Sequence, residues 1–269
     1  MSVNAFRLYG RYVAVSLRAQ MQYPGAFIAT SIGAFGATVV DFIAIWALFA
    51  RFRQIEGWQF HEIALFYGVV SVAFAIADAL TRGFDIFGPQ FVKTGDFDRL
   101  LVRPRSTVLQ LLGYELRATR IGRLAQGMIA WGVGIHFSSV DWTWSAWATL
   151  LFAVAGGTAL FCGILVLQAT LAFWTVESLE IANTLTYGGI EAAQYPLDVY
   201  ARWFRNFLIF VVPLGCVTYF PVAAALGRAD RTGLPEWLSS ITPVFGFFFL
   251  AVALRVWRFG VRHYTSTGT

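Results

Sequence analysis

Side chains that could carry catalytic chemistry are sparse and scattered in this sequence. The three histidines lie far apart along the chain, and Cys162 and Cys216 both sit in apolar stretches. This spacing predicts neither a metal site nor a disulfide, and it favours cysteines that act as small apolar side chains. The phosphate-binding pattern G-x-x-x-x-G-K-[ST] is absent, and Lys93 is the only lysine. We therefore expect no catalytic residues, no ATP site and no bound cofactor in this chain.

Two carboxylates lie inside apolar runs, where a charge costs about 2.5–3.5 kcal/mol at the centre of a membrane span. Asp78 is followed four residues later by Arg82, which favours an ion pair on one helix face over a substrate contact. Asp41 has no arginine nearby on the same helix. It is therefore expected to contact a cationic substrate, to pair with an arginine of another helix, or to stay protonated. Aromatic residues make up 17% of the chain, which suits an organic cation but also suits a lipid-facing surface.

The elements that position these carboxylates are predicted to be membrane-spanning helices. The 269 residues are 58% hydrophobic and 13% charged, with a mean hydropathy of +0.63. A soluble domain has roughly 45–50% apolar and about 25% charged residues, so the excess apolar surface here must face lipid. The formal charge of +5 comes from arginines at the ends of apolar runs. Such a pattern indicates topology signals and gives no reason to expect nucleic acid as a partner.

Six apolar runs predict an all-α integral membrane protein, with one transmembrane domain over residues 1–269. Each run is close to the ~20 residues that a bilayer core requires. The runs cover residues 25–50, 63–81, 121–137, 146–174, 207–226 and 241–257. Pro213 and Pro221 fall in the fifth run, where they are expected to kink or break the helix, for gating or for purely structural reasons.

The arginines predict the orientation of these helices. With the N-terminus inside, sixteen basic residues fall in cytoplasmic segments and four fall in outer loops. The four outer residues are Arg51, Arg53, Arg228 and Arg231. Because basic residues concentrate on the cytoplasmic side of membrane proteins, both termini are predicted to be cytoplasmic.

Three segments lie outside the predicted spans. Residues 1–24 carry three arginines at helical spacing, which indicates either an interfacial amphipathic helix or a plain cytoplasmic tail. Residues 83–117 form the longest cytoplasmic connection. Residues 175–206 are interpreted as a second cytoplasmic segment, whose glutamates, Glu191 among them, either line an inner vestibule or face the cytoplasm.

The stretch Gly95–Pro104, with the sequence GDFDRLLVRP, combines two acids, two arginines and four apolar residues. A short helix here would place Phe97, Leu100 and Leu101 on one side and the charges on the other. Such a helix would suit a groove on a soluble partner. The alternative is a solvated loop whose basic residues only set the topology.

The same stretch, followed by STVLQLL, resembles the cytoplasmic signature of ABC type-2 transporter permeases. A second block resembles the same family: Tyr195–Tyr200, then Phe210–Leu214, Tyr219–Pro221 and Leu226-Gly227. The order of these blocks, the chain length and the six apolar runs match that family over essentially the whole chain.

The resemblance implies a six-span permease of an ATP-driven exporter in the bacterial inner membrane. It implies a second permease, identical or related, and two copies of a separate ABC ATPase that bind ATP and Mg. Asp41 and the aromatic residues, rather than the resemblance, suggest that the substrate is a small molecule, hydrophobic or cationic, as in multidrug efflux. Residues 1–24 would match the family's interfacial elbow helix, and the segment between spans two and three would supply the coupling helix. The ATPase interface would then consist of Asp96, Phe97, Asp98, Arg99, Leu100 and Arg103.

Two other functions stay open at this stage. An ion-coupled secondary transporter or channel would use Asp41 and Asp78 and would show proton-dependent uptake without any ATPase. No internal repeat is visible, although such carriers usually have one. A non-transporting component of a membrane complex would bind partners without substrate-dependent stimulation of an ATPase.

Overall fold

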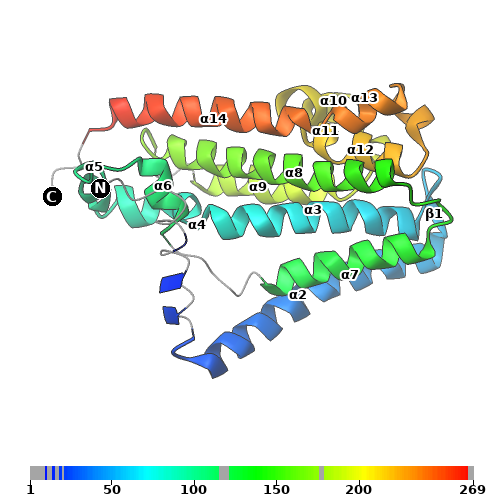
Figure 1. Cartoon of the computed structure of the whole chain (residues 1–269), viewed down its shortest axis with the longest axis horizontal. Coiled ribbons are helices and arrows are strands. Elements are labelled where there is room, and N and C mark those ends of the chain that lie inside the picture. Colours follow the sequence, from blue (N-terminus) through cyan, green and yellow to red (C-terminus); the bar gives the residue numbers. More distant parts are fainter. Residues whose placement is uncertain are drawn as a thin grey trace.

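The protein is a bundle of long helices with short elements gathered at both ends (Figure 1). The computed structural model describes residues 10, 14–15, 18–19, 21–114, 121–175 and 179–265. These residues are helical apart from one two-stranded hairpin and the connecting turns. The predicted all-α class is therefore confirmed. The predicted interfacial helix over residues 1–24 lies largely outside the described residues.

Among the described residues, the long helices run lengthwise in the bundle (Figure 1). They are α2 (Pro24–Phe52), α3 (Phe60–Leu80), α7 (Ile121–Phe137), α8 (Trp144–Leu171), α9 (Leu179–Ala193) and α14 (Val244–His263). In the described residues, α2, α3, α8 and the joined α13–α14 stretch Glu236–His263 are long and apolar enough to cross a membrane. A fifth candidate is a bent pair of helices, Arg202–Val211 and Leu214–Ala225. Helices α7 and α9, with 17 and 15 residues, are shorter.

The two ends of the bundle carry different short elements. We call one the hairpin end, after the strands β1 (Gln54–Ile55) and β2 (Trp58–Gln59), and the other the α5 end, after helix α5 (Asp96–Leu101). The α5 end also holds α4 (Arg82–Asp85), η1 (Gly88–Val92) and α6 (Thr107–Leu112). The hairpin end holds η3 (Leu197–Val199), α10 (Arg202–Asn206), η4 (Phe207–Val211), α11 (Leu214–Val217), α12 (Tyr219–Ala225), η5 (Ala229–Thr232) and α13 (Glu236–Ile241).

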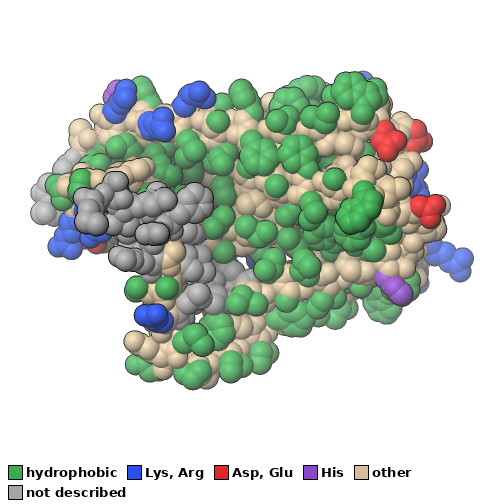
Figure 2. All heavy atoms as spheres, viewed as in Figure 1, with side chains coloured by type: hydrophobic (Ala, Val, Ile, Leu, Met, Phe, Trp, Pro, Cys, Tyr) green, Lys and Arg blue, Asp and Glu red, His purple; other side chains and the backbone are tan. Residues whose placement is uncertain are grey.

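Apolar side chains are spread along the face of the bundle drawn in Figure 2, as a lipid-facing surface requires. On α2 they include Ile32 and Val40, which are 65% and 63% exposed, and on α14 they include Phe248 at 66%. Charged side chains on the face drawn in Figure 2 gather towards the two ends. This distribution is the one expected when water contacts only the ends of the bundle.

Two small residues bring α8 and α14 into backbone contact. A Cβ on Gly246 would lie 2.0 Å from the carbonyl oxygen of Gly156, and a Cβ on Gly156 would lie 2.4 Å from the carbonyl oxygen of Pro243. Neither position therefore accommodates a side chain without moving a helix. Small residues at such crossings are how helices approach closely in a membrane, where no hydrophobic effect drives them together.

The fifth predicted span, residues 207–226, does not cross the bundle. Its helices bend by 72° at the break between Val211 and Leu214. Upstream of the segment, Asp198 contacts Trp58, and downstream of it Arg228 contacts Gly57. Since both contacts are with the hairpin, the segment starts and finishes at the hairpin end. The prediction that this run crosses the membrane, kinked or broken at its prolines, is wrong as to the crossing, because apolar composition does not distinguish a crossing from a re-entrant pair of helices.

The interpretation of residues 175–206 as a cytoplasmic segment also needs correction. Within this segment, α9 lies along α3 and α8 rather than in a connection (Figure 1). Residues 194–206 then lie at the hairpin end, because Asp198 contacts Trp58 there. They are thus at the end opposite to α5. Moving Arg202 and Arg205 to the hairpin end changes the division of basic residues from sixteen and four to fourteen and six.

Candidate functional site

A polar cavity lies between α2, α3, α7 and α9. Asp41 of α2 lines it, as does Glu191 of α9. The other lining residues are Tyr67, Ser71, Phe74, Arg123, Gln126, Tyr187, Ile190 and Gln194. Polar groups from four helices that are far apart in sequence therefore line one cavity in an otherwise apolar bundle.

The inner wall of this cavity is held by contacts among its own side chains. The Gln126 amide nitrogen donates a hydrogen bond to the Tyr67 hydroxyl, and both residues are buried. The guanidinium of Arg123 lies over the ring of Phe74, 5.2 Å from its centroid, where the ring face attracts a cation. Glu191 lies within electrostatic range of both Asp41 and Arg123. Two carboxylates thus share one arginine, and the site carries an excess of negative charge.

The outer side of the cavity is open at the flank of the bundle. Asp41 and Glu191 are exposed in the isolated chain, and Tyr187 is 43% exposed. The cavity has a volume of about 40 Å³, which is room for one or two waters. A carboxylate within a membrane span is costly next to lipid. This flank therefore suits a water-filled path or a protein neighbour better than a lipid boundary.

The second predicted intramembrane acid, Asp78, lies elsewhere. It is buried, and it follows the cavity residue Ser71 by seven residues of α3, about 10 Å nearer the α5 end. Arg82, which the sequence pairs with Asp78, forms an ion pair with Asp85 in the structure. Asp41 and Asp78 thus do not line a common cavity.

At the α5 end, a cluster of aromatic rings fastens α5 to the ends of the long helices. Phe97 of α5 is fully buried, with its ring centroid 4.9 Å from Phe87, 5.5 Å from Phe173 and 5.0 Å from Tyr264. Trp257 of α14 packs edge-on against Phe87 at 4.9 Å. Because such ring pairs add to the free energy of apolar burial, movement of α5 is tied to movement of α14.

Hydrogen bonds stabilise the turn between α5 and α6 and attach α6 to α14. The buried Gln110 amide of α6 donates to the carbonyl oxygens of Leu100 and Arg105, each at 3.1 Å. The indole nitrogen of Trp257 donates to the Thr107 hydroxyl at 3.2 Å. A buried carbonyl without a partner is unfavourable, so Gln110 stabilises the turn that joins α5 to α6. We call α5, α6 and this turn the α5–α6 unit.

The residues predicted to contact the ATPase divide into three groups by exposure. Phe97 and Leu100 point into the bundle, at 0% and 7% exposure. Asp96 and Asp98 are half-buried, and the Asp98 carboxylate, together with burial, raises the pKa of Tyr264. Arg99 and Arg103 face outward, as do Leu101 and Val102, which is 82% exposed. The predicted short helix is present, and its buried residues anchor it rather than offer a docking surface.

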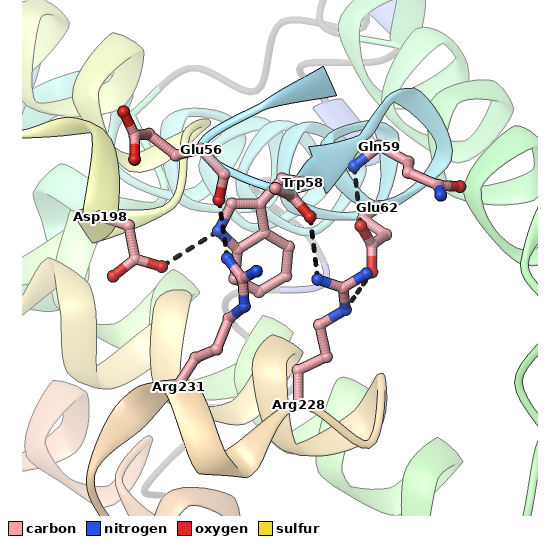
Figure 3. Close-up of polar contacts among 8 residues, drawn as sticks. Glu56, Trp58, Gln59, Glu62, Asp198, Arg228 and Arg231 are labelled. Atoms are coloured by element: carbon pink, nitrogen blue, oxygen red, sulfur yellow. Dashed lines mark hydrogen bonds and ion pairs between the residues drawn. The ribbon is translucent and has the colours of Figure 1, made fainter. Parts of the chain in front are cut away.

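At the hairpin end, a second cluster surrounds Trp58 (Figure 3). The indole nitrogen of Trp58 donates a hydrogen bond to the Asp198 carboxylate at 3.0 Å. The Tyr219 hydroxyl of α12 donates to the same carboxylate at 3.0 Å. The guanidiniums of Arg228 and Arg231 lie 5.1 and 5.2 Å from the Trp58 ring centroid. One buried indole therefore joins the hairpin to the elements on both sides of the re-entrant helices.

The hairpin backbone takes part in this cluster. Arg231 donates to the Glu56 carbonyl at 2.7 Å and Arg228 to the Gly57 carbonyl at 3.0 Å, while Arg228 also pairs with Glu62 at 2.6 Å (Figure 3). Glu56 and Gly57 have φ of +49° and +75°, as a two-residue type I′ turn requires. Glycine fits Gly57 for a second reason, since a Cβ there would lie 2.5 Å from the Arg231 guanidinium.

The two prolines of the predicted fifth span mark breaks in its helices. Pro213 lies between η4 and α11, at the 72° bend. Pro221 is buried in the first turn of α12, just after the interruption at Thr218. The break at Pro213 has a physical cause, because proline lacks the N–H that a continuous helix needs. A gating role stays a prediction.

Several residues of these sites were not singled out from the sequence. Arg123 is one of the arginines that the sequence indicates only as topology signals, although its side chain lines the Asp41 cavity. Trp58 and Asp198 carry no recognisable pattern, since 140 residues separate them. Gln110 and Gln126 had a usable signal, because an amide in an apolar run requires a hydrogen-bonding partner.

Comparison with known proteins identifies the relationship of this chain. A family model described as "ABC-2 family transporter protein" matches residues 35–268. That range contains the Asp41 cavity, the α5–α6 unit and the Trp58 cluster. No curated protein and no solved structure matches the chain.

Proposed function

The chain belongs to the ABC-2 transporter family, and on that premise we propose that it is the membrane-spanning subunit of an ATP-driven exporter. A separate ATPase, in two copies, would bind ATP and Mg and drive the cycle. A second permease, identical or related, would complete the path. The observation that carries this proposal is the α5–α6 unit, which exposes Arg99 and Arg103 while Phe97 is buried against aromatic rings next to the long helices.

The proposed topology has six crossings and differs from the sequence prediction in one of them. Helix α9 takes the place of residues 207–226 as the fifth crossing, alongside α2, α3, α7, α8 and α14. Helix α2 then begins and α14 finishes at the α5 end (Figure 1). Of the sixteen basic residues in the described part of the chain, ten lie towards that end, which supports a cytoplasmic location for it in a bacterial inner membrane, and we propose the same location for both termini.

The proposed ATPase contact surface is the outward face of α5 and the residues that follow it. Arg99, Leu101, Val102 and Arg103 combine charge with exposed apolar area. ATP-driven closure of two ATPase subunits would push this surface. Because Phe97 packs on Phe173 and on Trp257 of α14, the push would reach the bundle as a rigid-body shift. The energy comes from the difference in nucleotide affinity between the two states of the partner.

The translocation path is proposed to run along the flank that exposes Asp41 and Glu191. A second permease against this flank would cover both carboxylates and would form a path lined by charge and by aromatic rings. The cavity of about 40 Å³ is too small for an organic molecule, so substrate entry requires the two permeases to separate. The excess negative charge favours a cationic substrate, and the aromatic rings favour a hydrophobic one.

Cross-linking tests the ATPase contact directly. The native cysteines Cys162 and Cys216 are buried, so Val102→Cys introduces one exposed thiol on the proposed surface. In cells that express the chain with its neighbouring genes, a bifunctional thiol and amine reagent should link Val102→Cys to an ATPase. Val40→Cys, 63% exposed on α2, is the matched control and should give no such product. Absence of an ATPase from both the cross-linked and the co-purified material would overturn the exporter proposal.

Transport assays test the substrate path and separate it from the ion-coupled alternative. In membrane vesicles, Asp41→Asn with Glu191→Gln should lower ATP-dependent transport of a hydrophobic cation by about tenfold or more, the loss expected for charge-assisted contacts. Asp141→Asn, in an exposed loop, is the matched control. Unchanged transport in the double variant would refute the path. Proton-driven uptake without an ATPase would instead favour a carrier.

A further inference from the structure

Two adjoining cavities lie between α6 and α14 near the α5 end. One has a volume of about 370 Å³ and is lined almost entirely by apolar side chains of α3, α6, α8 and α14, and of Phe84 in α4. The other has a volume of about 360 Å³ and is lined by Ser106, Thr107, Arg258 and Arg262 among others. Val108 and Leu254 line both, so the two form one continuous groove.

The groove changes character along a single face of α14. Leu250 and Leu254 line its apolar part, and Arg258 and Arg262 line its basic part. These four residues are spaced by four, so they share one helix face over about 18 Å. The neighbouring Val252 and Phe259 are exposed, as on a helix that faces lipid. The transition from apolar to basic lining therefore falls where the hydrocarbon of a bilayer gives way to headgroups.

Among the described residues that line the basic part of the groove, none is acidic. Arg258 and Arg262 are exposed and form no ion pair within the described part of the chain. Two like charges one helical turn apart repel each other. A phosphate between them would remove that repulsion and would accept paired hydrogen bonds from each guanidinium. The exposed hydroxyl of Ser106, on the opposite wall, would supply a further donor.

We propose that this groove binds one anionic phospholipid, with its phosphate between Arg258, Arg262 and Ser106 and its acyl chain along Leu254 and Cys162. A soluble anion would use the basic part alone and would leave the apolar part in contact with water or detergent. A lipid fills both parts, because its acyl chain suits the apolar part and its negative phosphate suits the arginines of the adjoining basic part.

The bound lipid braces the α5–α6 unit. Thr107 and Val108 of α6 line the groove on one side, and Trp257 of α14, which donates to Thr107, lines it on the other. A lipid between them would hold α6 against α14 and so fix the position of α5. The content of anionic lipid in the membrane would thereby set how firmly the α5–α6 unit is attached to the bundle.

Native mass spectrometry of the purified chain in mild detergent tests this site without any ATPase or substrate, so its result is independent of the proposed function. Phosphatidylglycerol should bind at one molecule per chain and about tenfold or more tightly than phosphatidylcholine with the same acyl chains. Arg258→Gln with Arg262→Gln should weaken phosphatidylglycerol binding by about thirtyfold, the factor for two basic side chains at a membrane surface. Arg255→Gln, on the same helix but outside the groove, is the matched control and should change binding less than threefold.

Two further arms distinguish the lipid from other ligands. Leu254→Trp, which fills the shared part of the groove, should reduce phosphatidylglycerol binding while leaving the unfolding temperature of the chain within a few degrees. Glycerol phosphate at millimolar concentration should not displace the lipid. The proposal is overturned if the arginine pair and Arg255 have equal effects, if phosphatidylcholine binds as well as phosphatidylglycerol, or if glycerol phosphate competes.

Discussion

The indole nitrogen of Trp58 donates a hydrogen bond to the carboxylate of Asp198, across 140 residues of sequence. Trp58 is fully buried in the hairpin that joins α2 to α3, and Asp198 lies just after α9. This contact places the end of α9 and the hairpin at the same end of the bundle. It therefore decides the topology of the second half of the chain, which apolar runs alone leave open.

Removing the Asp198 carboxylate should destabilise the hairpin end. In Asp198→Ala, the buried Trp58 N–H loses its acceptor and the Tyr219 hydroxyl keeps only the Arg231 carbonyl, at a cost of about 1–3 kcal/mol for a buried donor without a partner. We expect a lower unfolding temperature in mild detergent, followed by intrinsic fluorescence. Asp230→Ala, which removes an exposed carboxylate from η5 at the same end, should leave the temperature nearly unchanged. Equal shifts for the two variants would mean that the Trp58 cluster contributes little.

Cysteine labelling should show that the two ends of the bundle lie on opposite sides of the membrane. Trp203 is 73% exposed at the hairpin end and Val102 is 82% exposed at the α5 end. In intact cells stripped of their outer membrane, an impermeant maleimide should label Trp203→Cys, and it should label Val102→Cys only after the inner membrane is opened. The native chain, with Cys162 and Cys216 buried, is the background control. Labelling of both variants only after the inner membrane is opened would support a cytoplasmic location for residues 194–206.

Anchoring and outward-facing residues of α5 should respond differently to substitution. Phe97→Ala removes a fully buried ring and should cost about 3–5 kcal/mol, seen as a lower unfolding temperature. Arg99→Ala with Arg103→Ala changes exposed side chains and should alter stability by less than about 0.5 kcal/mol per site. The arginine variant should nevertheless recover less ATPase on co-purification. If the arginine variant recovers as much ATPase as the native chain and unfolds at the same temperature, these arginines do not contribute to the ATPase interface.

The crossing of α8 and α14 should not tolerate a methyl group. Gly246→Ala places a Cβ against the Gly156 carbonyl and should cost about 1–3 kcal/mol through overpacking. Gly132→Ala in α7 has nothing within 4 Å of the added Cβ. There alanine should be neutral or stabilising by up to about 1 kcal/mol, because it is the better helix former. The ranking of the two unfolding temperatures checks the closeness of this helix pair, and a reversed ranking would contradict it.

The sequence by itself determined the class of the protein. Apolar runs of spanning length and arginines at their ends predicted an integral membrane protein built from helices, because insertion into a bilayer depends on local composition. The motif around Gly95–Pro104 predicted both the short helix α5 and the family, which the family comparison confirms. Local patterns are sufficient for such features, since a helix or a motif involves residues that are close in sequence.

Only the tertiary structure decided which apolar run turns back and which charged groups meet. Residues 207–226 have the composition of a span, yet contacts of Asp198 and Arg228 with the hairpin hold both ends of the segment at one end of the bundle. Asp41, Arg123 and Glu191 belong to three helices and share one cavity. Phe97, whose position in the motif suggested a docking surface, is buried by the rings of Phe87 before η1, Trp257 of α14 and Phe173 after α8. Each outcome depends on how distant helices pack, and packing is a property of the assembled bundle rather than of any single stretch of sequence.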